Sequence, residues 1–122
     1  MWQSSPSLCS VHSNLVALVQ HEQLFKECDL TLSELAARLD IHPNYLSQVI
    51  NEKEGVHFYD YLNRLRIEEF MKQAALPENK PYTLLGIAYA CGFNSKSSFN
   101  RSFKKVTDRS PSEFMKQIGA GL

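Results

Sequence analysis

The sequence has few cysteines and no long hydrophobic run. Only 3 of its 122 residues are cysteines, and none of them form the CxxC pair that is typical of redox and zinc motifs. No apolar stretch approaches the ~18 residues that a membrane-spanning helix requires. The opening MWQSSPSLCS lacks the basic and apolar regions of a secretion signal. These absences argue against a disulfide framework and a membrane segment, and they favour a cytoplasmic protein with reduced thiols.

A catalytic pattern is also missing. The sequence contains no glycine-rich phosphate loop, no Ser/His/Asp or Cys/His set at a useful spacing and no paired carboxylates in an evident cleft. The best candidates for a metal site are Cys9, His12, His21 and Cys28, but their spacing fits no compact zinc pattern. Cys91 falls on the apolar face of a predicted helix, which indicates a core position rather than a redox-sensing thiol. The protein is therefore predicted to have no enzymatic activity, metal or cofactor.

The formal charge is balanced overall but not along the chain. The 13 basic and 13 acidic residues give a net charge of zero. Residues 1–40 hold two cations and five acids, a net charge of −3, whereas residues 94–122 hold six cations and two acids, a net charge of +4. A near-neutral chain with one cationic end can still present a local basic surface to a nucleic acid.

Hydrophobic periodicity predicts an all-α protein. Residues 1–10 are rich in serine and lack periodicity, so they are predicted to be a flexible tail. Helical spacing of apolar residues is present in segments 11–27, 32–39, 43–54, 58–76, 84–91 and 95–105. Thr31 and Glu34 form a capping-box pattern at the second segment. Pro43 stands at the first position of the third segment, and Gly55 stands where that segment ends.

Part of this pattern occurs twice. Leu32, Leu35, Ala36 and Leu39 are followed 52 positions later by Leu84, Ile87, Ala88 and Cys91. After the turn the offset is 53, so that Leu46 corresponds to Phe99 and Ile50 to Phe103. The repeat indicates a duplicated helix–turn–helix unit. We therefore predict a first subdomain at 11–56, a linker helix at 57–76 and a second subdomain at 77–122.

The second helix of each copy has a polar outer face. The exposed set Asn44, Ser47, Gln48 and Asn51 corresponds to Ser97, Asn100, Arg101 and Lys104. Together with Lys96, the later set contains no acid. Arginine can pair bidentately with guanine and asparagine with adenine, while serine and lysine reach phosphates. Ser95 is predicted to cap this helix, whose first backbone N–H groups are then available to a phosphate.

The same helix has an opposite, aromatic face made of Phe93, Phe99 and Phe103. These rings are predicted to fix the helix on its neighbours, so that the polar face meets DNA. For one such helix alone, an ordinary solvated surface is an equally good interpretation. Recurrence of the face at matched positions, after a tight turn in both copies, favours the DNA-binding interpretation.

Several of these motifs together resemble the DNA-binding domain of AraC-type transcription regulators. They are TLSELAARL, PNYLSQVI, FYDYLNRLRIEE and CGFNSKSSFNRSFKK followed by SPSEF, and the resemblance covers about residues 30–118. It implies seven helices in two homeodomain-like helix–turn–helix subdomains. Each subdomain would place one recognition helix, about 43–53 or 95–105, in the major groove. The linker helix would hold the two about one DNA turn apart.

The resemblance also implies which residues face the DNA. By motif position, the base-facing residues are Asn44, Ser47, Gln48, Lys96, Ser97, Ser98 and Arg101, to which the residue types add Asn100. The phosphate contacts expected around them are His42, Asn51, Arg64, Arg66, Ser95, Lys104 and Lys105. For three of these residues a second role is open. His42 could instead cap the first recognition helix, and Arg64 and Arg66 could instead pair with Glu68 and Glu69.

Two positions depart from the family pattern. The family usually has glycine where this chain has Asp40, in the first turn, and Asp108, after the second recognition helix. Both positions are expected to require a positive φ, which aspartate adopts at a small cost in stability. The first recognition helix also lacks a cation before Lys53, so direct base reading by that subdomain is expected to be weak.

The expected partners follow from the same resemblance. They are a double-stranded DNA operator, RNA polymerase and, in a longer chain, an N-terminal sensor domain of which this chain would be the C-terminal neighbour. The protein is expected in the bacterial cytoplasm, associated with the nucleoid when bound. The alternative is a protein-interaction module that kept the fold with weak or no specific DNA binding. Its supports are the zero net charge and the acids Glu52 and Glu54.

Overall fold

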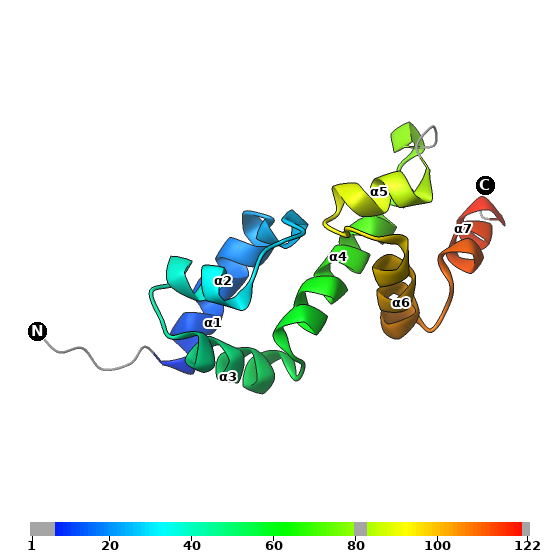
Figure 1. Ribbon diagram of the computed structural model, residues 1–122. Helices are drawn as coiled ribbons and strands as arrows, with labels where there is room; N and C mark the ends of the chain where they lie inside the picture. Colours follow the sequence, from blue (N-terminus) through cyan, green and yellow to red (C-terminus); the bar gives the residue numbers. More distant parts are fainter. Residues whose placement is uncertain (1–6, 80–82, 121–122) are drawn as a thin grey trace, which may run out of the picture. The chain divides into compact units, whose positions relative to one another are not determined.

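The computed structural model describes residues 7–79 and 83–120, and these residues form helices and connecting turns without a β-strand (Figure 1). The chain divides into two compact units, Met1–Tyr61 and Leu62–Leu122. The all-α prediction is confirmed. The boundary between the two units falls inside the predicted linker helix, and the division into two subdomains and a separate linker stays a prediction.

The first unit opens with α1, Leu8–Val16. Its start lies within the predicted tail, because Ser7 caps the helix by accepting a hydrogen bond from the Ser10 backbone N–H at 3.1 Å. The rest of that tail, residues 1–6, lies outside the described residues. The helix continues as a π-helical turn, Ala17–His21, and the chain then reverses at Gln23 with φ of 59°. The helix that was predicted to run from residue 11 to residue 27 therefore ends at His21.

The next two helices of this unit form the predicted helix–turn–helix. Helix α2 is Leu32–Arg38 and helix α3 is Pro43–Glu54. The capping box is confirmed, since the Glu34 N–H donates to Thr31 Oγ1 at 3.1 Å and the Thr31 N–H donates to Glu34 Oε1 at 3.0 Å. The core that α1, α2 and α3 share is apolar and almost fully buried; it includes Val11, Leu15, Val19, Leu35, Ala36, Leu46, Val49 and Ile50.

Helix α4, Phe58–Ala74, begins in the first unit and continues through the start of the second. Its buried side chains change sides along its length, as the sequence predicts. Phe58 and Tyr61 are buried in the first unit, whereas Ile67, Phe70 and Ala74 belong to the core of the second. One part of this helix packs in the core of the first unit and the other part packs in the core of the second. Its apolar residues therefore do not form one continuous stripe.

The second unit adds a short 3₁₀ turn, Pro77–Asn79, and helices α5 (Leu84–Ala90), α6 (Lys96–Thr107) and α7 (Pro111–Ala120). Thr83 caps α5 by accepting from the Gly86 N–H at 2.9 Å, as Thr31 caps α2. The capping box is not repeated, because Gly86 stands where the first copy has Glu34. Cys91 is 1% exposed, which confirms its predicted place in the core.

Candidate nucleic-acid interface

The first candidate recognition helix is α3, whose two ends are fixed by local hydrogen bonds. The His42 ring caps its start, with the Asn44 backbone N–H donating to His42 Nδ1 at 3.0 Å, and Pro43 occupies the first helical position. The structure therefore supports the capping role for His42. The helix ends at Gly55, which has φ of 73° and whose N–H donates to the Asn51 carbonyl.

The outer face of α3 is polar and carries side chains that bond to one another. Asn44, Gln48 and Asn51 are exposed, and Ser47 is half-buried. Gln48 Nε2 donates to Glu52 Oε1 at 3.3 Å, and Asn51 Nδ2 donates to the Ser47 carbonyl at 3.0 Å. A glutamine that reads adenine uses its amide oxygen and one of its two N–H donors. The bond to Glu52 occupies one donor of Gln48 and holds its side chain against the acid.

The second candidate recognition helix, α6, is fixed by aromatic packing. Ser95 caps it by accepting from the Ser98 N–H at 3.1 Å, as predicted. Phe99 and Phe103 are 2% and 0% exposed. The Phe70 ring on α4 lies 4.7 Å from Phe99 and 5.7 Å from Phe103, centroid to centroid. Because these rings interlock with the core, they set which face of α6 points outward.

That outward face is basic. Ser97, Arg101 and Lys104 follow one another at helical spacing on the side opposite the phenylalanines, and all three are exposed. Lys105 is exposed beside them, and Ser98 is half-buried. Helix α6 contains four cations and no acid, so its outer surface has a positive potential that attracts phosphate.

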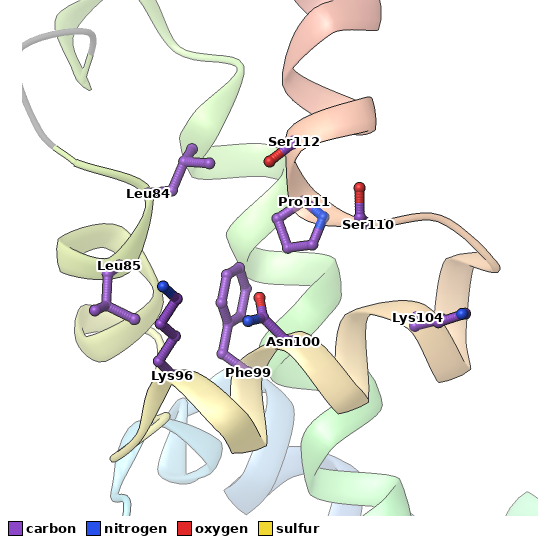
Figure 2. Close-up of a pocket in the computed structure, with 9 residues that line it drawn as sticks. All are labelled: Leu84, Leu85, Lys96, Phe99, Asn100, Lys104, Ser110, Pro111 and Ser112. Carbon is purple, nitrogen blue, oxygen red and sulfur yellow. The ribbon is translucent and has the colours of Figure 1, made fainter.

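Lys96 and Asn100 occupy the flank of α6 that faces α5 and the start of α7 (Figure 2). Both side chains are exposed. They border a surface groove together with apolar side chains from the neighbouring helices. The predicted base-facing residues of α6 thus lie on two adjacent strips, one directed outward and one directed toward this groove.

The two units share a backbone pattern at the ends of their helices. Asp40 and Gly92, which correspond at the offset of 52, have φ of 57° and 116°. Gly55 and Asp108, which correspond at the offset of 53, have φ of 73° and 62°. Each pair therefore contains one glycine and one aspartate in the left-handed region. The positive φ expected for Asp40 and Asp108 is confirmed.

Asp108→Gly is expected to raise the free energy of unfolding by about 0.5–1 kcal/mol, because glycine adopts the left-handed conformation without a Cβ penalty. The matched change Gly55→Asp should lower it by a similar amount. Open space surrounds a Cβ placed on Gly55, so only the backbone conformation resists that side chain. Urea denaturation of both variants measures the effect. A destabilised Asp108→Gly protein would show that the aspartate makes a favourable contact of its own.

The two arginines of α4 differ in exposure. Arg64 is half-buried, whereas Arg66 is only 6% exposed and its Nη1 donates to Asn63 Oδ1 at 3.0 Å. A guanidinium buried to this extent is not presented to a phosphate. The phosphate contact of Arg66 stays a prediction, and its burial favours the alternative in which Arg66 interacts within the protein. Arg64 keeps partial access to solvent.

One further cation near α6 was not singled out from the sequence. Arg109 is exposed in the turn between α6 and α7, directly after the left-handed Asp108. Its backbone N–H donates to Thr107 Oγ1 at 3.1 Å, so the turn holds a defined shape. The sequence does include Arg109 among the six cations of residues 94–122. Periodicity could not select it, because turn residues have no helical phase.

Metal sites and membrane-spanning helices were also considered within the described part of the chain. Among residues 7–79 and 83–120, His, Cys, Asp and Glu side chains form no group of three that could hold a metal ion. No helix in these ranges combines the length and apolar character needed to cross a membrane. Among residues 7–78 and 83–116, each buried side-chain nitrogen or oxygen has a hydrogen-bond partner.

Comparison with known proteins gives consistent results. The family model described as "Helix-turn-helix domain" matches residues 35–117. The uncharacterized HTH-type transcriptional regulator YijO of Escherichia coli K12 is 36% identical over 93 residues, which are 76% of this chain and 32% of that protein. The chain spans a third or less of the length of the curated relatives that it matches. These relatives are named as transcriptional regulators rather than enzymes.

Two solved structures have a similar fold. A protein of unknown function from Listeria innocua aligns with a TM-score of 0.75 and 28% identity, over 93% of this chain and 98% of that chain. The C-terminal domain of AraT, a response regulator from Geobacillus stearothermophilus, aligns with a TM-score of 0.66 and 25% identity, over 95% of this chain and 88% of that chain. Both matches extend over nearly the whole sequence.

Proposed function

Because the chain belongs to the AraC-type helix-turn-helix family of transcription regulators, we propose that it binds double-stranded DNA with sequence specificity through α3 and α6. Each helix would enter the major groove, in two successive segments of one operator. The internal repeat gives one chain two readers, so a monomer could occupy an asymmetric site. In this proposal the protein acts on transcription without catalysing a reaction.

The observation that carries the proposal is the outward face of α6. Ser97, Arg101 and Lys104 are exposed in a row, on a helix whose opposite side is locked by Phe99 and Phe103. A rigid helix is needed for base reading, because an arginine must hold both of its hydrogen bonds to guanine at once. Lys104 and Lys105 would contact the phosphates on either side of the groove.

The two recognition helices are proposed to contribute unequally. Helix α6 has four cations and no acid, whereas α3 has Lys53 together with Glu52 and Glu54. Gln48 is also bonded to Glu52. In our proposal α6 therefore supplies most of the affinity and specificity. Helix α3 adds a weaker contact through Asn44, Ser47 and Gln48.

Selection of bound sequences from a random DNA library, at two salt concentrations, tests this proposal. We expect an enriched motif with two elements about ten base pairs apart, the stronger of which is read by α6. Affinity should fall steeply with salt, because each phosphate contact releases counterions. Enrichment of one element alone would limit α3 to backbone contact. No enrichment and a flat salt dependence would reject DNA binding in favour of a protein partner.

The length of the relatives is the basis for proposing a further domain. Since the chain covers 32% of YijO, we propose that a sensor domain accompanies this DNA-binding unit in the working regulator. We also propose RNA polymerase as a partner at the promoter and the bacterial cytoplasm as the location. Co-purification of RNA polymerase with a DNA-bound, full-length regulator would test the polymerase contact.

A further inference from the structure

Gln48 and Glu52 form a pair on the outer face of α3. They are four residues apart, which places them on the same side of the helix, and both are exposed. Gln48 Nε2 donates to Glu52 Oε1 at 3.3 Å. An ionised carboxylate only accepts hydrogen bonds, so it holds the amide nitrogen of Gln48 toward itself and directs the amide oxygen away. The pair therefore fixes which way round the amide lies.

The polar side chains next to this pair bond to other parts of the first unit. Asn51 Nδ2 donates to the Ser47 carbonyl at 3.0 Å. Lys53 Nζ donates to Cys9 Sγ on α1 at 3.3 Å. These contacts direct Asn51 to its own helix and Lys53 to α1, so neither competes for the Glu52 carboxylate. The carboxylate is therefore left to the amide of the pair.

The corresponding pair on α6 has different chemistry. At the offset of 53, Gln48 corresponds to Arg101. Glu52 corresponds to Lys105 at the same offset. Guanine presents two acceptors in the major groove, which suit the donors of arginine, whereas adenine presents one acceptor and one donor. An amide with its oxygen and one N–H free matches adenine, and the pair on α3 leaves these two groups free.

We propose that Glu52 is a positioning residue that orients Gln48 for adenine, an inference that rests on the DNA-binding function proposed above. The amide nitrogen of glutamine has two N–H donors. One would stay on Glu52, while the other would donate to adenine N7 and the amide oxygen would accept from adenine N6. Glu52 would thus contact no base itself and would determine which base Gln48 accepts.

The same arrangement disfavours guanine, whose N7 and O6 are both acceptors. The oriented amide has one N–H left for these two atoms, and its oxygen would face O6 without a proton between them. The negative charge of Glu52 also repels the guanine acceptors and the phosphates. Glu52 would therefore lower the affinity for DNA in general while it increases the preference for adenine. This agrees with the smaller contribution proposed for α3.

A DNA-free measurement tests the pair. Glu52→Gln should shift the side-chain amide resonances of Gln48 in ¹H–¹⁵N NMR spectra, because the charged acceptor is lost. Glu54→Gln is the matched control, since it removes the same charge two residues later on α3 and Glu54 Oε2 lies 2.6 Å from His12 Nε2 instead. That variant should leave the Gln48 resonances in place. Unchanged Gln48 resonances in Glu52→Gln would show that the pair does not form, and would overturn the proposal.

The second measurement is quantitative competition between operators that differ at single base pairs. The base pair read by Gln48 is the one whose preference is lost in Gln48→Ala, and the wild-type protein should prefer adenine over guanine there. Glu52→Gln should reduce this preference about two- to fivefold, the effect of one exposed charged pair, and should raise the affinity for both operators. Glu54→Gln should keep the preference. An unchanged preference in Glu52→Gln would overturn the positioning role.

An analogue base identifies the contacted atom. Replacing the adenine at this position with 7-deazaadenine removes the N7 acceptor and keeps the base pair. The wild-type protein should then bind more weakly, whereas Gln48→Ala should bind both operators equally. Equal binding of both operators by the wild-type protein would rule out the contact to adenine N7.

A double variant assigns the effect of Glu52 to the amide. In the Gln48→Ala protein, adding Glu52→Gln should change no base preference, because no amide is left to orient. A preference change that persists there would mean that Glu52 contacts a base directly, such as cytosine N4, and would overturn the positioning role. Absence of any enriched operator for the wild-type protein would instead reject the proposed function, and the role of Glu52 with it.

Discussion

Replacing Phe103 with alanine is expected to lower the free energy of unfolding by about 3–5 kcal/mol. The ring is fully buried and has three aromatic neighbours, with centroids at 5.7 Å from Phe70, 5.9 Å from Phe99 and 5.6 Å from Phe114. The loss includes the transfer of the ring to water, the cavity left behind and these ring contacts. A domain has only about 5–15 kcal/mol of stability, so the second unit should be close to unfolding.

Urea denaturation compared with Val106→Ala separates this effect from a general cost of shortening an apolar side chain. Val106 lies on the same helix, three residues later, and is 37% exposed. Its truncation should change the free energy of unfolding by no more than about 0.5 kcal/mol. Equal midpoints for the two variants would mean that Phe103 is not part of the core. Loss of NMR signals from α6 and α7 in Phe103→Ala would place the damage in the second unit.

Much of the helical architecture could be predicted from the sequence, because several independent local signals agree. Leu46 and Ile50 in the first copy, and Phe99 and Phe103 in the second, recur at helical spacing. This spacing predicts which face of each recognition helix is buried. The caps at Thr31 and Ser95 give helix starts. Even the left-handed backbone at Asp108 follows, since its counterpart in the repeat is a glycine that ends a helix. In each case the determining contacts lie within a few residues of one another.

The features that the sequence did not predict depend on contacts that no local pattern encodes. Gln23 reverses the chain in a left-handed conformation without the glycine that usually marks such a turn. Arg66 is buried although arginine is normally exposed, and this depends on which elements pack around α4. The groove beside α6 was likewise not predicted. It brings Leu85 and Pro111 together, and these residues are distant in sequence.

Arg101→Ala is expected to weaken binding to the selected operator by about 1–3 kcal/mol and to relax the preference at one base pair. Arg101 is exposed at the middle of the outward face of α6, between Ser97 and Lys104. In the proposed docking of α6 its guanidinium would lie at the floor of the major groove and bond to O6 and N7 of guanine together. Quantitative competition against operators with single base changes measures both effects.

Arg101→Lys distinguishes base reading from charge alone. Lysine keeps the positive charge but lacks the planar fork that pairs with guanine. We therefore expect Arg101→Lys to retain the salt dependence and still lose the base preference. Gln48→Ala, the corresponding change on α3, should have the smaller effect because Gln48 is bonded to Glu52. If Arg101→Ala kept the wild-type preference and only lowered the salt slope by about one, Arg101 would be a phosphate contact, and another residue of α6 would read the base.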